Sequence, residues 1–129
     1  MNAVSIDIKD MLIGAGLGLS FGTNLFIAKM PTTPVKVVCL YDVASVAPEL
    51  GITEHQYNRD VFQCVVRDNS YSDAMTKAYQ IMEWLQGKRN IQINGVTYTL
   101  IRALFVPYLM EWDDNNRPNI IFSMEAQRR

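Results

Sequence analysis

Residues 71–86 carry the strongest structural signal in the sequence, and that signal is helical. Apolar side chains recur there at helical spacing, Ser70 precedes the first turn as a candidate N-cap with Asp73 three positions on, and Gly87 follows the last turn. Runs typical of β-strands lie on both sides of this segment. A chain with this order is expected to build a sheet with helices packed on it.

The segment before residue 43 predicts one short helix and two strands. Ser5 is a candidate cap for a helix over residues 6–13, which Gly14, Gly16 and Gly18 end. These glycines follow a helix instead of opening one, so they do not form a phosphate-binding loop. Residues 23–29 and 35–42 predict a hairpin-like pair of strands, joined by a turn that two prolines stiffen.

The rest of the chain predicts four further strands. Residues 60–68 indicate a strand buried on one or both faces, and residues 90–93 and 97–106 flank Asn94-Gly95, a strong hairpin signal. A last strand over residues 119–125 follows a polar turn at residues 113–118. Residues 43–59, about seventeen positions without clear periodicity, predict either a binding loop or a disordered arm.

These elements together predict an α+β fold. We expect a mostly antiparallel or mixed sheet of about four to six strands with two helices packed on one face. The 129 residues fit one domain, residues 1–129, with one core.

Composition excludes several kinds of partner and compartment. The net charge of −1 comes without a basic stripe, so we expect no specific nucleic-acid binding. Cys39 and Cys64 each lie in an apolar run and are expected as buried, reduced thiols. No stretch reaches the ~18 apolar residues of a membrane helix, so we expect no membrane partner and synthesis in a cytoplasm.

No candidate reaction centre is visible. The single histidine, His55, lies in the polar loop without a second ligand or a fixed carboxylate beside it. Asp113 and Asp114, followed by two asparagines, lack the spacing of a calcium loop and are read as a turn. The serines lack the setting of an activated nucleophile. We therefore expect no enzyme activity, no catalytic residue, no cofactor and no metal.

Two tryptophans are candidate interface residues. Trp84 lies off the apolar stripe of the 71–86 helix, which predicts partial exposure. Trp112 lies beside the acidic turn, near Tyr108 and Leu109. For both, two interpretations stay open: contact with another subunit, or cover for a neighbouring part of the same chain.

A series of short motifs resembles one known family over nearly the whole chain. Read in order, these are Phe21-Gly22-Thr23-Asn24-Leu25-Phe26, Met30-Pro31, Leu40-Tyr41-Asp42, Phe62-Gln63 with Arg67, Ser70-Tyr71, Asn94-Gly95, Tyr98 and residues 113–118. In this order and spacing they are similar to the tail terminator (minor capsid) proteins of long-tailed phages.

The resemblance implies a structural virion protein. Such a protein forms a hexameric ring on the head-proximal end of the tail tube, stops tube polymerisation and provides the surface that joins tail to head. The implied partners are copies of itself, the tail-tube protein and a head-completion or connector protein, and DNA passes through the ring without specific binding. The resemblance favours a non-contractile, siphovirus-type tail. The implied location is the head–tail junction of the virion, after assembly in the host cytoplasm.

Two alternatives stay open: a head-completion or neck adaptor protein that binds the portal side, and a free regulatory or ligand-binding domain. Under the terminator hypothesis, charged and aromatic residues of the long loop, the helix, the acidic turn and the C-terminus are candidates for subunit or partner contacts. They are Glu49, His55, Tyr57, Arg59, Trp84, Trp112, Asp113, Asp114, Arg117, Arg128 and Arg129.

Overall fold

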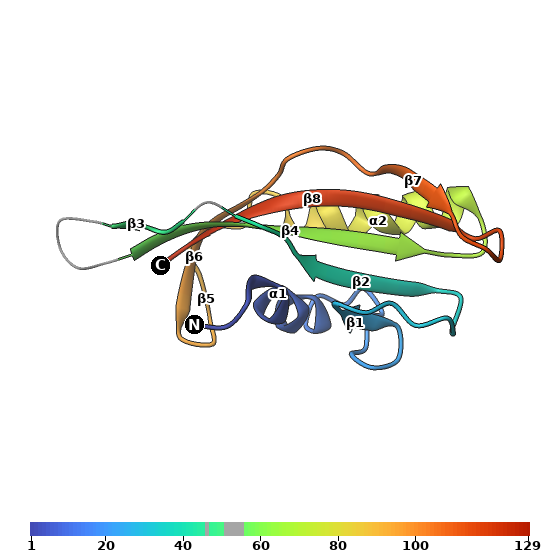
Figure 1. Cartoon of the computed structure of the whole chain (residues 1–129). Helices are drawn as coiled ribbons and strands as arrows, with labels where there is room; N and C mark the ends of the chain where they lie inside the picture. Colours follow the sequence, from blue (N-terminus) through green and yellow to red (C-terminus); the bar gives the residue numbers. More distant parts are fainter. Residues whose placement is uncertain (46, 51–55) are drawn as a thin grey trace.

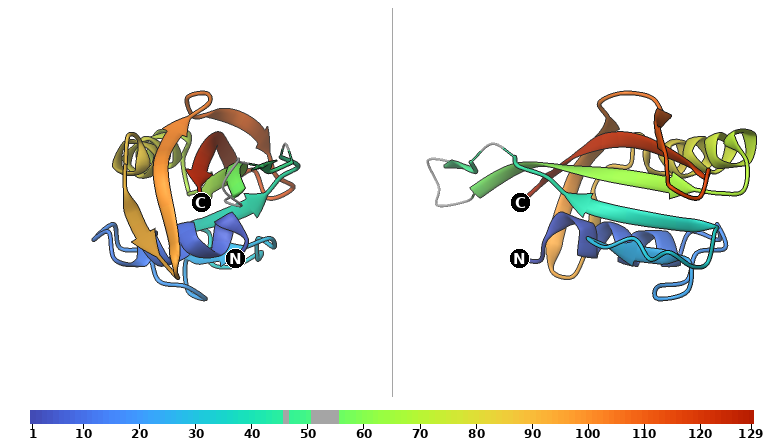
Figure 2. Two further views of the ribbon diagram at one scale, coloured as in Figure 1. Left: turned by 90° about the vertical axis from the view of Figure 1, so that its left-hand side faces the viewer. Right: turned by 45° about the vertical axis from the view of Figure 1, so that its right-hand side comes forward.

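The structure is a computed structural model that describes residues 1–45, 47–50 and 56–129. Two helices lie on one face of a curled sheet, which confirms the predicted α+β class (Figures 1 and 2). In chain order the elements are α1 (Val4–Ile13), β1 (Leu25–Ile27), β2 (Val37–Asp42), β3 (Glu49–Leu50), β4 (Gln56–Arg67), α2 (Tyr71–Leu85), β5 (Ile91–Ile93), β6 (Val96–Ala103), β7 (Tyr108–Trp112) and β8 (Pro118–Arg128). The short strands β3 and β7 were not predicted.

Strand β8 is the central strand of the sheet, because it pairs with β4, β6 and β7. The main strand order is β1-β2-β4-β8-β6-β5, with β3 also pairing with β4 and β7 also pairing with β8. On one side, β4 runs antiparallel to β8 along almost its whole length. On the other side, β6 and then β7 occupy successive parts of β8. The chain from β6 to β7 is thus one interrupted strand. The sequence predicted instead a single strand over residues 97–106.

The predicted hairpin between the first two strands is wrong, because β1 and β2 pair in parallel. The chain leaves β1 at Ala28, whose φ is 65°, and returns along a loop to the start of β2. Arg67 of β4 holds this loop in place: its guanidinium donates hydrogen bonds to the carbonyls of Pro31 (2.6 Å), Pro34 (2.8 Å) and Val35 (3.1 Å). A side chain distant in sequence therefore sets the path of the loop.

The start of α1 also differs from the prediction. The helix begins at Val4 after Ala3, which makes no side-chain cap. Ser5 lies inside the helix, where its hydroxyl and backbone N–H donate to the Asp42 carboxylate at 2.6 and 3.0 Å. Ser5 therefore ties α1 to the end of β2 and caps nothing. At α2 the predicted cap is confirmed, because the backbone N–H of Asp73 donates to Ser70 Oγ at 3.2 Å.

The long loop is shorter than expected. Strand β4 begins at Gln56, so Tyr57 and Arg59 are strand residues, and β3 pairs with this end of β4. His55 lies outside the described residues. The predicted Asn94-Gly95 hairpin is confirmed: both residues have positive φ, 50° and 77°, as the tight turn between β5 and β6 requires.

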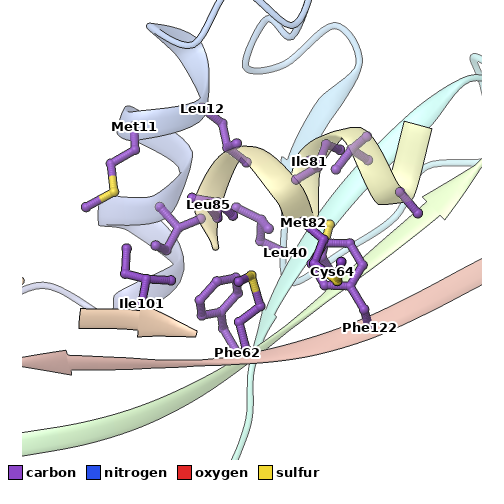
Figure 3. Packing of buried hydrophobic residues seen from close by; sticks show 14 of the residues in the cluster. Met11, Leu12, Leu40, Phe62, Cys64, Ile81, Met82, Leu85, Ile101 and Phe122 are labelled. Carbon is purple, nitrogen blue, oxygen red and sulfur yellow. The ribbon is translucent and has the colours of Figure 1, made fainter. Parts of the chain in front are cut away.

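The core lies between the helices and the sheet (Figure 3). Side chains of both helices meet those of β2, β4, β6 and β8; the ones that Figure 3 labels are Met11, Leu12, Leu40, Phe62, Cys64, Ile81, Met82, Leu85, Ile101 and Phe122. Cys39 and Cys64 are free and buried, as predicted. Burial raises the pKa of the Cys64 thiol, which therefore stays neutral and packs as a small apolar group.

Candidate assembly surfaces

The face of the sheet that is turned away from the helices, here called the outer face, has two chemically different halves. Side chains alternate along each strand, so the residues of β4 and β8 that do not enter the core lie on this face. Near Tyr57 of β4 and the C-terminal half of β8 they are polar. Near the opposite ends, here called the apolar half, the buried Val65 and Ile121 lie beside the polar Gln63 and Asn119.

Hydrogen bonds link the side chains of the polar half across three strands. The Tyr57 hydroxyl donates to Gln127 Oε1 at 2.6 Å and contacts Thr99 Oγ1 at 2.9 Å. Gln127 in turn donates from Nε2 to Glu125 Oε1 at 2.8 Å. This bond is the main cause of the lowered pKa of Glu125, and Arg102 at 3.3 Å adds to it. The polar half therefore carries a charged carboxylate beside cationic side chains.

Arg59 belongs to the same polar half. Its guanidinium lies 5.6 Å from the centre of the Tyr57 ring, within the range of a cation–π contact, and its charge also favours ionised Glu125. The structure thus brings together Tyr57 and Arg59, two of the residues that the sequence analysis selected. It places them on a sheet surface and not on the expected loop.

The apolar half is hollowed. A pocket of about 370 Å³ lies there, and its lining residues are Met30, Tyr41, Gln63, Val65, Met110, Glu111, Asn119 and Ile121. Val65 and Ile121 form a buried apolar floor. Nothing local in the sequence predicts this pocket, because its walls come from five separate segments of the chain.

Arg128 is not a surface residue. It is 6% exposed and lies among polar groups that join the two ends of the chain. Its Nε donates to Asp60 Oδ2 at 2.7 Å and its Nη1 to the carbonyl of Asn2 at 2.7 Å, with Asp7 Oδ2 at 3.5 Å. The guanidinium is thus committed to contacts within the subunit. Arg129 is exposed, and its backbone pairs with Thr97 in both directions.

The acidic turn, residues 113–117, is ordered by one carboxylate. Asp113 Oδ1 accepts from the backbone N–H groups of Asn115 and Arg117, both at 2.9 Å, and Oδ2 accepts from Arg117 Nε at 2.7 Å. These bonds outweigh desolvation and lower the pKa of Asp113. Arg117 also donates to the carbonyl of Thr32 at 2.6 Å. Asp114 projects into solvent. The reading of this segment as a turn is confirmed.

The two tryptophans differ in exposure. Trp84 is half-buried against the core, and Lys88 Nζ lies 4.0 Å from its ring centre, so it covers its own domain. Trp112 is 53% exposed. Glu49 contributes backbone to β3, where it pairs with Tyr57.

Trp112 ends an exposed apolar segment that the sequence analysis missed. From residue 104 to residue 112 most large side chains face solvent: Leu104, Phe105, Val106, Tyr108, Met110 and Trp112. A continuous apolar run ordinarily indicates a buried strand, so the sequence pattern does not predict that these side chains are exposed. Pro107 inside the run was the available signal, since proline is confined to strand edges and interruptions.

Within the described residues, no group of three or more His, Cys, Asp or Glu side chains could hold a metal ion. No helix in that part of the chain is long and apolar enough to cross a membrane. The surfaces described above can bind and position other molecules, and they hold no assembled set of catalytic groups.

Residues 8–128 match the family model described as bacteriophage tail terminator protein. The chain belongs to the bacteriophage tail terminator family. It is thus a structural component of the virion tail, which confirms the resemblance drawn from the motifs. No curated protein matches this terminator.

Two solved structures share the fold of this terminator. One is a chain from the virion of a native gene transfer agent particle, with a TM-score of 0.68 and 16% identity over 98% of this chain and 94% of that chain. A second matches with a TM-score of 0.59 and 14% identity over 98% of this chain and 91% of that chain. At these identities the likeness concerns the fold.

Proposed function

We propose that this terminator forms a hexameric ring on the head-proximal end of the tail tube, stops tube polymerisation and presents the surface to which the head attaches. The family match over residues 8–128 carries the proposal. A ring of one kind of subunit needs a contact between two different patches of the chain, repeated until it closes. Its two ends then offer unlike surfaces to the tail-tube protein and to a head-completion or connector protein.

The exposed apolar side chains between residues 104 and 112 support a role in assembly. Large contiguous apolar patches are uncommon on monomeric proteins and mark interaction surfaces. Aromatic residues and methionine are enriched at the centres of such interfaces. Phe105, Tyr108, Met110 and Trp112 fit this composition.

The polar half of the outer face suits a surface past which DNA moves. The charges of Arg59 and Arg102 there are partly offset by Glu125, with neutral hydrogen-bonding side chains between them. Tight retention of DNA needs many uncompensated cations, because affinity comes from phosphate neutralisation. A mixed surface of this kind lets DNA pass without specific binding.

Electron microscopy of particles made when this gene is disabled tests the proposal. Overgrown tubes without heads, beside DNA-filled heads without tails, are expected, and supplying the protein from a plasmid should restore normal tail length. Tails of normal length with a joining defect would instead assign the protein to the neck adaptors. In a second test, purified terminator added to polymerising tail-tube protein should shorten the tubes in proportion to its concentration.

A further inference from the structure

An apolar arch, residues 104–107, projects from the sheet between β6 and β7 (Figure 1). Ala103 pairs with Met124 and Tyr108 pairs with Ile121, so four residues of this strand face two residues of β8. The two extra residues force the chain away from the sheet. The arch is thus a consequence of the register on β8.

The arch exposes apolar side chains and free backbone donors. Leu104, Phe105 and Val106 are 42%, 39% and 57% exposed. The Phe105 ring packs against Tyr108, with their centres 5.4 Å apart, which braces it in this position. The backbone N–H of Leu104 donates to Ser123, whereas those of Phe105 and Val106 have no partner within the described residues.

The pocket on the outer face complements the arch, because it has room for a large side chain and offers a hydrogen-bond acceptor. Its volume of about 370 Å³ far exceeds the ~30 Å³ of one water molecule, so a large side chain can enter it. Asn119 lines it and is only 6% exposed, and its Oδ1 is a buried polar atom that has no hydrogen-bond partner in the part of the chain that the structure describes. Buried acceptors in native proteins are nearly always satisfied by protein or water, so Asn119 Oδ1 is available to a donor that enters the pocket. The other lining residues are the apolar Met30, Val65, Met110 and Ile121, the aromatic Tyr41, and the polar Gln63 of β4 and Glu111 of β7.

We propose that the arch of one subunit inserts into the outer-face pocket of a neighbouring copy of this chain. The arch supplies apolar side chains and N–H donors, and the pocket supplies apolar walls and the acceptor Asn119 Oδ1. Because the arch and the pocket are different patches, the contact is heterologous and repeats from copy to copy until the ring closes. This inference rests on the proposed ring and names the surfaces that build it.

Cysteine pairs in assembled tails test the contact. Val106→Cys and Met30→Cys chains are produced together in cells in which the native gene is disabled, and the purified tails are oxidised. A cross-linked dimer is expected only when both variants are present. A chain carrying both changes should give a ladder that ends at the ring. Ile13→Cys replaces Val106→Cys as the control and should give no dimer; Ile13, at the end of α1, is 46% exposed, against 57% for Val106. Native Cys39 and Cys64 are buried and should not react.

The outcomes separate this inference from the proposed function. Tails of normal length without the mixed cross-link overturn the arch-to-pocket contact and leave the terminator role standing. If even the wild-type gene fails to restore tail length, the terminator role itself fails. A dimer formed by Val106→Cys alone would show that arches meet each other, which also overturns the contact.

Asn119→Leu supplies a second, independent test. In the isolated subunit it removes an unsatisfied acceptor, so the urea midpoint should stay equal or rise. In the assembled protein it removes the acceptor for the neighbour's donor, so the concentration needed to cap tubes should rise at least tenfold. Capping at an unchanged concentration would contradict the proposal. If Leu104→Asp, added to the chain that carries Val106→Cys and Met30→Cys, leaves the cross-linked ring intact and abolishes only tube capping, the arch binds the tube protein and the inference is wrong.

Discussion

The guanidinium of Arg128 lies 3.5 Å from the carboxylate of Asp7 inside the subunit, so the final strand and the first helix meet through a buried ion pair. Asp60 of β4 accepts from the same guanidinium at 2.7 Å. A buried charge that loses its partner is costly, whereas an exposed one is not.

Arg128→Met should therefore destabilise the subunit by about 3–5 kcal/mol, because Asp7 and Asp60 lose their cation in a buried site. Urea unfolding followed by circular dichroism measures this change. Arg129→Met is the matched control, since Arg129 is exposed, and should change stability by less than about 0.5 kcal/mol. Equal effects of the two substitutions would show that the buried network adds nothing.

Tyr98 should make stability depend on alkaline pH. Its buried hydroxyl donates to Asp7, and burial together with this bond raises the pKa of Tyr98 above its ordinary value of 10.0. The unfolded chain releases this proton near pH 10 while the folded chain keeps it, so the free energy of unfolding should fall as pH rises above 10.

Tyr98→Phe should lower stability by about 1–3 kcal/mol at pH 7, because the buried Asp7 loses a donor. It should also make the decline above pH 10 shallower. Urea midpoints between pH 8 and pH 11 give both quantities. Tyr71→Phe, at an exposed tyrosine, should leave the pH profile unchanged. A profile for Tyr98→Phe that parallels the wild type would contradict the argument.

Asp113 and Asp114 are adjacent carboxylates with different roles. Asp113→Ala removes the acceptor for the backbone N–H groups of Asn115 and Arg117 and for Arg117 Nε. The urea midpoint should therefore fall, and amide exchange in the acidic turn should accelerate. Asp114→Ala should leave both unchanged. Because hydrogen bonds lower the pKa of Asp113, its contribution should be present at neutral pH and disappear as pH falls below about 4.

Arg67→Met should loosen the path between β1 and β2. The carbonyls of Pro31, Pro34 and Val35 lose their Arg67 donor, and Thr32 loses a weaker one, which should cost about 1–3 kcal/mol. The Ala28 N–H, which donates to Leu40 at 2.8 Å, should then exchange faster with solvent. Hydrogen-exchange mass spectrometry measures this locally. Arg89→Met is the exposed control, and equal exchange in both variants would rule out the role of Arg67.

The fold class and most elements could be predicted because their signals are local. The Ser70 cap and the Asn94-Gly95 turn each follow from a few adjacent residues. The parallel pairing of β1 could not be predicted, because it depends on Arg67, more than thirty positions beyond the loop that it holds. Ser5 was misread for the same reason: its partner, Asp42, lies 37 positions away.

The candidate site was predicted less well than the fold. Charged residues were chosen as surface contacts, but Arg128 is enclosed by partners that only the tertiary structure brings to it. The apolar arch was taken for part of a strand, because apolar runs do not reveal on which side of a sheet their residues lie. Tyr57 and Arg59 lie close together, on a strand instead of the expected loop, and their role as subunit or partner contacts stays a prediction.

The central place of β8 has a consequence for how the subunit folds. Its partner β4 lies far away in sequence, so that Asn58 pairs with Arg128 across 70 positions, and α2 packs mainly on these two strands. Closing so large a loop costs entropy before any pairing is gained, which makes such topologies slow to fold. Helix α2 can form early, yet its apolar side stays exposed to solvent until β8 pairs with β4. Newly made chains should therefore pass through a partly folded intermediate that exposes apolar surface. Chaperones would bind the chain mainly at this stage.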